Sequence, residues 1–366
     1  MSFLTPHRKK QFTDFLIINL VWIVTILLWD FLQTEVPNTA KEAIQDPIAM
    51  KMERLNLLLA GVFLGTIFGL MNLYIKIRQD QLRKQSYGRI ILVYSITHII
   101  LTAISVFIIG VLSELIVNGE IDDDTFTKIR GFVRSKNFPP IVMFTYIVSA
   151  GIILFQIINQ KFGPGVLLDL LLGRYRHPKE VNLIFLFMDL KSSTTYAERL
   201  GHFKYSELIQ DCFSDLTTPV NSCEAEIYQY IGDEVVLMWP YLKGIKNGNC
   251  IKLLFQFKKI LQKRSNHYLS NYGFVPQFKA GINGGVLTAA EVGAIKRSIA
   301  YHGDVINTAS RIQGQCNTFN REILISGQIV HDVINSQSFE FEFIDNIQLK
   351  GKKEKVSIYS INNNEE

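Results

Sequence analysis

The sequence predicts two parts: an N-terminal all-α bundle of four transmembrane helices, and a C-terminal α+β domain. Two observations predict this division. Four long apolar stretches lie before about residue 160, whereas the later part of the 366 residues alternates short apolar runs with charged and turn residues. The chain is also 48% hydrophobic, with a mean hydropathy of +0.16, which is high for a soluble protein. We therefore expect a membrane anchor at 1–159, a linker at 160–180 and a folded domain at 181–366.

Each apolar stretch is close to the roughly 20 residues that a helix needs to cross the hydrocarbon core. The four run from Phe12 to Phe31, Leu55 to Ile75, Ile90 to Leu112, and Pro139 to Ile158. For the polar residues inside them, Asn19, Asn72 and His98, we favour hydrogen bonds between helices over a ligand site. The first stretch follows a basic segment, but it is too long for the hydrophobic region of a signal peptide and no small-residue cleavage site follows, so we expect a retained helix.

Charge predicts the orientation. The loop between the second and third stretches is basic, as are the segments before the first stretch and after the fourth. The loop at 113–138 instead contains the acidic run Asp122, Asp123 and Asp124. By the positive-inside rule, both termini and the central loop are cytoplasmic. The predicted location is the cell (inner) membrane, crossed several times, with the C-terminal domain in the cytoplasm.

Net charge and cysteine spacing limit which binding partners and metal sites can be expected. The net charge is +5 and no dense basic run with interleaved aromatics occurs, so nucleic acid is not an expected partner. The four cysteines, Cys212, Cys223, Cys250 and Cys316, form no C-x-x-C pair. We expect buried, reduced thiols rather than a disulfide or a zinc site.

The linker at 160–180 begins with Gly163-Pro164-Gly165, which is predicted to break the fourth helix. An apolar run from Val166 to Leu172 follows and ends at Gly173. It is either a dimerising, signal-passing helix or a packed connector, and the sequence favours neither.

The C-terminal part begins with a continuous apolar run, Val181 to Met188, which predicts a buried strand. Ser193 or Thr194 is expected to cap a helix that continues towards Leu216. The later elements are a hairpin, a helix, a strand, a helix and further strands, at Glu226–Trp239, Ile245–Tyr268, Gln277–Asn283, Val305–Cys316, Glu322–Ile325 and Phe339–Ile361. This order predicts an antiparallel sheet that helices cover on one face.

Two aspartates stand at predicted strand ends. Asp189 follows the first buried strand, and Asp233 lies in the hairpin turn Ile231-Gly232-Asp233-Glu234. Carboxylates so placed can converge on a pair of cations that polarise a nucleophilic oxygen and neutralise a polyphosphate. Taken singly, each aspartate is explained by ordinary turn chemistry. The surrounding residues decide between these interpretations.

Four short motifs follow one another at domain-like spacing. They are Phe187-Met188-Asp189-Leu190, Ser192-Ser193-Thr194, Ile231-Gly232-Asp233-Glu234 and Gly303-Asp304-Val305-Ile306-Asn307-Thr308-Ala309-Ser310-Arg311. Together they resemble the class III adenylate and guanylate cyclase family over about residues 181–362. The last motif is the most specific, because Asn307 and Arg311 stand four apart and share one helix face.

The resemblance implies a ferredoxin-like fold and a cyclase reaction, in which the ribose 3'-oxygen of a nucleoside triphosphate attacks the α-phosphorus and pyrophosphate leaves. Asp189 and Asp233 match the family's metal-binding aspartates, so the expected cofactors are two divalent cations, Mg2+ or Mn2+. Ser192, Ser193 and Thr194 match a phosphate-cradling turn at a helix start, where free backbone N–H groups attract anions.

Further roles come from the same resemblance. Asn307 matches the residue that positions the ribose, and Arg311 matches the one that stabilises charge on the α-phosphate. Lys350 or Lys352 resembles the triphosphate-binding lysine, and Lys279 stands where many members have an arginine near the phosphates. The resemblance also implies a homodimer in which the aspartates of one chain face Asn307 and Arg311 of the other.

Base selection departs from the family pattern. Adenylate cyclases usually have lysine at the position of Gln229 and aspartate or threonine at that of Ala300, and guanylate cyclases commonly have glutamate and cysteine. The Gln229 amide donates and accepts, so it suits either purine. ATP is favoured only because adenylate cyclases are the commoner bacterial-type members, and a guanylate or other triphosphate cyclase stays open.

Three other functions compete. A silent receptor that only dimerises is disfavoured, because both aspartates, Asn307 and Arg311 are retained. A diguanylate cyclase would need a Gly-Gly-Asp/Glu-Glu-Phe turn, which the hairpin turn only partly imitates. A transporter or channel is disfavoured because the four stretches contain neither an intramembrane charged pair nor an internal repeat.

Overall fold

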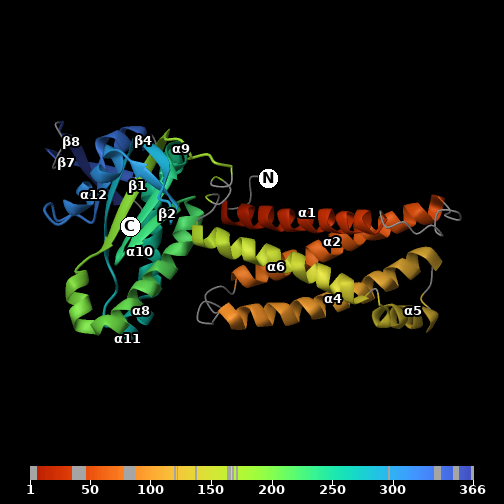
Figure 1. The fold of residues 1–366 in the computed structure, drawn as a ribbon. Coiled ribbons are helices and arrows are strands. Elements are labelled where there is room, and N and C mark those ends of the chain that lie inside the picture. The colour runs from red at the N-terminus through yellow and green to blue at the C-terminus, as the bar shows by residue number, and fades with distance from the viewer. Residues whose placement is uncertain are drawn as a thin grey trace. The chain divides into compact units, whose positions relative to one another are not determined.

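The computed structural model describes residues 6–34, 47–77, 87–118, 121, 123–136, 138–162, 166, 169, 172–295, 297–333, 339–348 and 354–363. The chain divides into two compact units, Met1–Ile158 and Asn159–Glu366. The first unit is built from helices and the second around one large sheet (Figure 1).

Each of the four predicted apolar stretches lies on a helix of the first unit. The helices are α1 (Pro6–Thr34), α2 (Pro47–Ile77), α4 (Tyr87–Asn118), α5 (Asp123–Arg134) and α6 (Phe138–Phe162). The short helix α5 falls in the predicted acidic loop at 113–138, where the sequence pattern did not indicate a helix.

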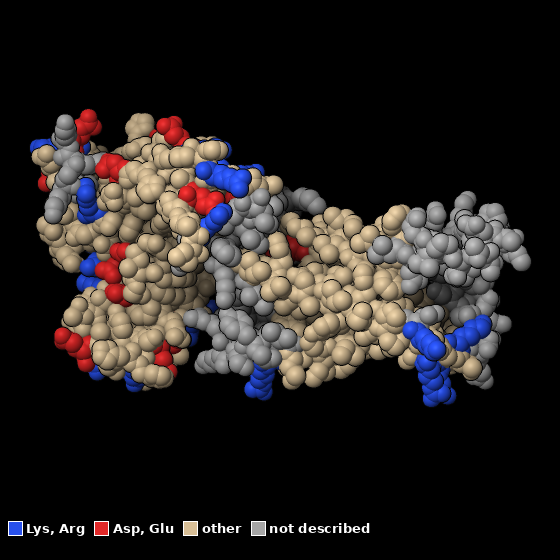
Figure 2. Space-filling view, viewed as in Figure 1, with Lys and Arg blue, Asp and Glu red and all other residues tan. Residues whose placement is uncertain are grey.

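Three helices contain windows long and apolar enough to cross a membrane: Phe12–Trp29, Leu92–Leu112 and Phe138–Gln156. In the described part of α2 the apolar stretch, Leu58–Leu73, is shorter. Large apolar side chains of this unit point outward, and on the side shown in Figure 2 its surface is mostly uncharged between its ends. Helices that are apolar all round suit lipid better than water, so these three indicate membrane insertion.

The polar side chains inside this unit pair between helices. The pairs are Thr66 with Asn19 at 3.3 Å, Asn72 with Gln156 at 2.7 Å, and His98 with Ser149 at 3.0 Å. The prediction of interhelical hydrogen bonds for Asn19, Asn72 and His98 is confirmed. Such bonds are worth about 0.5–2 kcal/mol each in a membrane protein.

Glycines on α2 allow α1 to approach it closely. Gly61, Gly65 and Gly69 recur every four residues, and a Cβ at each would lie within 3.1 Å of an α1 atom. At Gly65 the added Cβ would lie 2.8 Å from the Cα of Asn19. This row of small residues lets the two backbones come together, as is common where helices pack without a hydrophobic driving force.

The second unit follows the predicted order of elements. Its strands are β1 (Lys179–Leu190), β2 (Glu226–Ile231), β3 (Glu234–Pro240), β4 (Phe278–Val292), β5 (Ser298–His302), β6 (Ile323–Ser326), β7 (Phe339–Ile347) and β8 (Val356–Asn363). Its helices are α8 (Ser193–Ser222), α9 (Tyr241–Ile245), α10 (Asn249–Lys263), α11 (Ser265–Tyr272), α12 (Asp304–Gly314) and α13 (Gly327–Val333), with a 3-10 turn at Lys246–Gly248. The buried first strand and the hairpin are confirmed, whereas β5 was not predicted.

The strands form one sheet in the order β2-β3-β1-β4-β6-β8-β7, with β5 paired to β4. The recorded pairs are antiparallel except β4 with β6, which run parallel. The prediction of a purely antiparallel sheet is therefore wrong, and the sheet is mixed. The reason is that the chain returns from β5 through α12, and such a crossover places β6 parallel to β4.

Helices pack on both faces of the sheet, so the prediction of one covered face is also wrong. In β1, Leu186 and Met188 point to the face covered by α8 and α10. Phe185 and Phe187 point to the opposite face and pack in one cluster with Ala309 of α12. A strand that is apolar on both sides needs cover on both sides, which is why β1 is a continuous apolar run.

The linker is described only in part. Helix α6 ends at Phe162, directly before the predicted break at 163–165, and that break and most of the run Val166–Leu172 lie outside the described residues. The carbonyl of Tyr175 accepts a hydrogen bond from the backbone N–H of Glu291 at 2.8 Å. The end of the linker is therefore attached to β4.

We expect Gly65→Ala to lower the free energy of unfolding of the helical unit by about 1–3 kcal/mol, because the added methyl group overpacks the α1–α2 contact. The full-length protein in detergent, unfolded by a denaturant titration, provides the measurement. Gly151→Ala is the matched control, since a Cβ at Gly151 of α6 meets nothing within 4 Å. Equal stabilities of the two variants would contradict the assigned packing.

Candidate active site

The end of β1 and the β2–β3 hairpin bring two aspartates together. Asp189 is the penultimate residue of β1, and Asp233 lies in the two-residue turn between β2 and β3. Gly232 enters that turn with a φ of 64°, a conformation that favours glycine. The carboxyl groups of Asp189 and Asp233 lie close enough that Asp233 raises the pKa of Asp189. The structure thus brings together the two residues that the sequence singled out.

Two further side chains reach Asp189. Lys279 is its cross-strand partner in β4, and the Lys279 Nζ lies 3.4 Å from Asp189 Oδ2. From α12, Gln313 Nε2 donates to the same oxygen at 3.4 Å. Sequence reasoning missed Gln313, because a single buried glutamine on a helix has no distinguishing pattern. Lys279 is therefore a member of the site rather than a solvated surface lysine.

The positive charge beside the carboxylate pair, that of Lys279, is smaller than the combined negative charge of the two carboxylates. Burial, together with the hydrogen bond and charge of Asp233, raises the pKa of Asp189 against the opposing effect of Lys279. Burial and the charges of both aspartates likewise raise the pKa of Glu234. The Oδ2 of Asp233 is buried and has no hydrogen-bond partner among the described residues. Buried carboxylate oxygens without partners are costly unless a cation compensates them, and hard divalent cations prefer such oxygens.

The turn at Ser192, Ser193 and Thr194 starts α8 next to the aspartates. Ser192 has a φ of 59° and makes no side-chain cap, so its hydroxyl and the first N–H groups of the helix are left for other partners. Tyr205 connects the turn to the carboxylates. It is hydrogen-bonded to Ser193, while burial and the charge of Asp233 raise the pKa of Tyr205 to about 12.

Helix α12 presents Asn307 and Arg311 away from its buried side. Asn307 is exposed and donates to the carbonyl of Gly303 at 3.4 Å. Arg311 is half-buried, and no hydrogen bond or ion pair is recorded for it within the described part of the chain. In a single chain the described contacts join neither residue to Asp189 or Asp233.

A close approach of backbone to backbone fixes α12 on the sheet. A Cβ at Gly281 of β4 would overlap the backbone of Gln313 and lie 2.7 Å from the carbonyl oxygen of Ala309. Only glycine fits this position, so α12 lies directly on β4. The helix face with Asn307 and Arg311 is therefore positioned by Gly281, a residue without a reactive side chain.

The two base-selecting candidates lie on β2 and β5, two strands that do not pair with each other in the sheet. Gln229 is exposed on β2, and Ala300 is partly buried on β5. Next to them in sequence stand Tyr228 and Tyr301, whose ring centroids are 5.2 Å apart. Sequence reasoning missed these tyrosines, although their position beside both candidates was a usable signal.

The triphosphate-binding candidates Lys350 and Lys352 lie outside the described residues. Neither lysine can be assigned a contact, and the choice between them stays a prediction.

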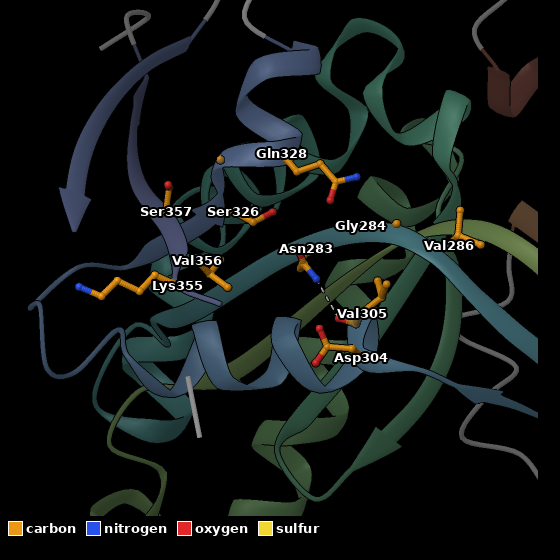
Figure 3. Close-up of a pocket in the computed structure, with 12 residues that line it drawn as sticks. Asn283, Gly284, Val286, Asp304, Val305, Ser326, Gln328, Lys355, Val356 and Ser357 are labelled. Carbon is orange, nitrogen blue, oxygen red and sulfur yellow. Dashed lines mark hydrogen bonds between the residues drawn. The ribbon is translucent and has the colours of Figure 1, made fainter. Parts of the chain in front are cut away.

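A cavity of about 380 Å3 opens at the N-terminal end of α12 (Figure 3). Residues of β4, α12, the β6–α13 junction and β8 line it, among them Asn283, Asp304, Ser326 and Gln328. Asn283 Nδ2 donates to the carbonyl of Val305 at 3.0 Å across its floor. Neither aspartate of the carboxylate pair lines this cavity, so it is a separate feature.

Comparison with known proteins identifies the domain. Residues 176–363 match the family described as "Adenylate and Guanylate cyclase catalytic domain". This is a catalytic domain of the nucleotide cyclase type. The chain belongs to the class III adenylate and guanylate cyclase family, as the motifs around Asp189, Asp233 and Asn307 predicted.

Two curated relatives are named as adenylate cyclases. Adenylate cyclase 2 of Rhizobium meliloti is 32% identical over 221 residues, covering 60% of this chain and 61% of that protein. Adenylate cyclase of Anabaena cylindrica is 25% identical over 186 residues, covering 49% of this chain and 36% of that protein. The chain thus spans less than two thirds of either relative.

A solved structure supports the fold. The structure of a bacterial light-regulated adenylyl cyclase superposes with a TM-score of 0.52 at 17% identity, covering 63% of this chain and 66% of that one. At this identity the similarity concerns the fold alone.

We expect Asp189→Asn to stabilise the protein in the absence of divalent cations, and by more as the pH rises. A carboxyl group whose pKa is raised on folding favours the folded state most below its unfolded pKa near 4. That contribution is lost as the pH rises through the raised folded value. Thermal unfolding with a chelator between about pH 4 and pH 8 measures the difference between variant and wild type.

The control for this experiment is Glu198→Gln, on an exposed position of α8. Its difference from wild type should be nearly constant over the same range. If the stability difference between Asp189→Asn and wild type is constant or shrinks with rising pH, folding does not raise the pKa of Asp189.

Proposed function

We propose that this protein is a membrane-bound nucleotide cyclase, a phosphorus–oxygen lyase that converts ATP into cyclic AMP and pyrophosphate. The proposal rests mainly on the adjacent pair Asp189 and Asp233 in a cyclase-family domain. The single positive charge of Lys279 beside them does not balance the negative charge of two carboxylates. The names of the two curated relatives favour ATP. A guanylate or other triphosphate cyclase is the alternative, because Gln229 and Ala300 fit neither family pattern.

Asp189 and Asp233 would hold two divalent cations, Mg2+ or Mn2+. The buried, unpartnered Oδ2 of Asp233 and the raised pKa of Asp189 both fit this role. When bound, such ions polarise the 3'-hydroxyl and neutralise the triphosphate. The described residues contain no group of three or more His, Cys, Asp or Glu side chains placed around one point. Two carboxylates would leave coordination positions for phosphate oxygens and water, as is usual for Mg2+.

The protein's own groups would orient the triphosphate. The N–H groups at Ser192, Ser193 and Thr194 offer donors at the positive end of α8. Lys279 lies within 3.4 Å of Asp189 and can turn its ammonium towards a phosphate beside it. Lys350 or Lys352 is proposed as a further phosphate ligand. The catalytic task of these groups is positioning and charge stabilisation.

A second copy of the chain would complete the site. Asn307 and Arg311 would place the ribose and stabilise charge on the α-phosphate, yet no described contact in one chain joins them to the aspartates. An arginine that is half-buried and unpaired is available for a partner group. We therefore propose a homodimer in which each site takes its aspartates from one chain and Asn307 and Arg311 from the other.

The helical unit would anchor the enzyme in the cell (inner) membrane. Three helices satisfy the length and hydropathy needed, and we include α2 as a fourth span, because its interhelical bonds and glycines join it to α1. An even number of spans and the basic flanks put both termini and the catalytic domain in the cytoplasm. Nucleoside triphosphates are available there.

We expect the full-length protein in membranes to form cyclic AMP from ATP with Mn2+ or Mg2+, and Asp233→Ala to lower the rate at least about 100-fold. Removing one carboxylate should abolish cation binding, since few other oxygen ligands are present. Incubation with each of the four nucleoside triphosphates, followed by mass identification of the products, provides the measurement.

A different cyclic product would retain the mechanism and change the substrate. No product from any triphosphate, with a folded dimer present, would instead support a silent receptor. Glu198→Gln is again the matched control and should retain the wild-type rate.

The composite site gives a separate test. Asp233→Ala and Arg311→Ala are each expected to be nearly inactive, whereas co-expression of the two variants should restore part of the activity. In a mixed dimer one of the two sites would contain both the aspartate pair and Arg311. If co-expression restores nothing while mixed dimers are isolated, each chain must form its site alone.

A further inference from the structure

Strand β2 contains an irregularity beside Gln229. Its pairing with β3 runs Ile227 with Leu237 and then Gln229 with Val236, so Tyr228 has no cross-strand partner. This is a β-bulge, in which one extra residue lets two consecutive side chains point to the same face. Bulges of this kind re-aim side chains and occur frequently next to active sites.

The register shows towards which face of the sheet the side chains at the bulge point. Val236 belongs to the cluster that contains Phe187 and packs on the α12 side of the sheet, and its pairing puts Gln229 on that side. Tyr228 packs against the same cluster. The bulge therefore presents Tyr228 and Gln229 together on the face that carries Asp189 and α12. Without it, two adjacent residues would point to opposite faces.

Tyr228 connects β2 to β5. The two rings meet edge to face with centroids 5.2 Å apart. Burial raises the pKa of the Tyr228 hydroxyl, and the nearby backbone of Tyr301 acts in the opposite direction. Phe185 of β1 supports both rings, at 6.0 Å from Tyr228 and 5.6 Å from Tyr301. Three strands thus share one aromatic cluster at the position where Gln229 emerges.

Ala300 does not face this cluster. It pairs with Ala290, whereas Tyr301 pairs with the buried Ala289. Successive side chains of a strand alternate, so the Ala300 methyl points away from the side of Tyr301. Its methyl group also has no hydrogen-bonding capacity. Gln229 therefore stands next to Tyr228 on this face, whereas Ala300 does not.

We propose that Tyr228 is a specificity-determining positioning residue, which fixes Gln229 against β5 so that its amide reads the purine base in one orientation. This inference rests on the proposed cyclase function and deepens it. The adenine edge carries an amino donor where guanine carries a carbonyl acceptor. A glutamine amide offers both a donor and an acceptor, so it discriminates only when its orientation is held. The aromatic cluster would supply that restraint, together with a hydrogen bond from the backbone N–H of Tyr301 to the Tyr228 hydroxyl.

Tyr228→Phe tests the hydrogen bond and Tyr228→Leu tests the ring. With the full-length enzyme, kcat and KM are measured for ATP and for GTP. We expect the ratio of kcat/KM for ATP over GTP to fall about 3- to 10-fold in Tyr228→Phe, the loss that one buried hydrogen bond corresponds to, and further in Tyr228→Leu. The change should appear in KM for the preferred base, with kcat at saturation nearly unchanged, because the metal site is untouched.

Tyr359→Phe is the matched control, since this half-buried tyrosine of β8 packs edge to face on Phe343 at 5.4 Å, away from β2. It should leave the base ratio as in wild type. A wild-type enzyme that discriminates bases, combined with Tyr228 variants whose ratio is unchanged or whose thermal stability alone falls, would overturn this inference. A wild type that forms no cyclic nucleotide would instead overturn the proposed function.

Discussion

Two carboxylates that share one partly buried position are the constraint around which the catalytic domain is built. Asp189 lies next to Asp233, and burial together with this neighbouring carboxyl group disfavours the charged form of Asp189. Three features form this position: the end of β1, the glycine in the hairpin turn, and the register that pairs Lys279 with Asp189. Lys279 and Gln313 compensate it only in part. In the proposed function, this remaining imbalance would favour the binding of cations.

The placement of α12 is a second consequence of close packing. Because Gly281 lets the helix lie on β4, the helix brings Gln313 to the aspartates and turns Asn307 and Arg311 outward. In the proposed homodimer, these two groups of residues would be complementary halves of a site on different surfaces of one chain. Such a division suits an enzyme whose activity is controlled by how two copies meet, and it connects the proposed homodimer to the geometry of a single helix.

The helical unit relies on different physics. The hydrophobic effect contributes little to the association of helices in lipid. Close packing at small residues and interhelical hydrogen bonds stabilise the helical unit instead. The glycine row of α2 and the bonded pairs at Asn19, Asn72 and His98 show both devices in one unit. Polar side chains that would be costly alone in lipid thus become specific contacts.

The sequence by itself determined the four apolar helices, the buried first strand, the hairpin and the family, because apolar periodicity and short motifs are local properties. It also singled out Asp189 and Asp233, since both stand at strand ends. The tertiary structure alone decided that the sheet is mixed and covered on both faces, because parallel pairing of β4 and β6 depends on the α12 crossover. It likewise revealed Gln313, Tyr228 and Tyr301. Their roles arise from register, a bulge and backbone approach, which join residues far apart in sequence. The only local signal was the position of the two tyrosines beside Gln229 and Ala300.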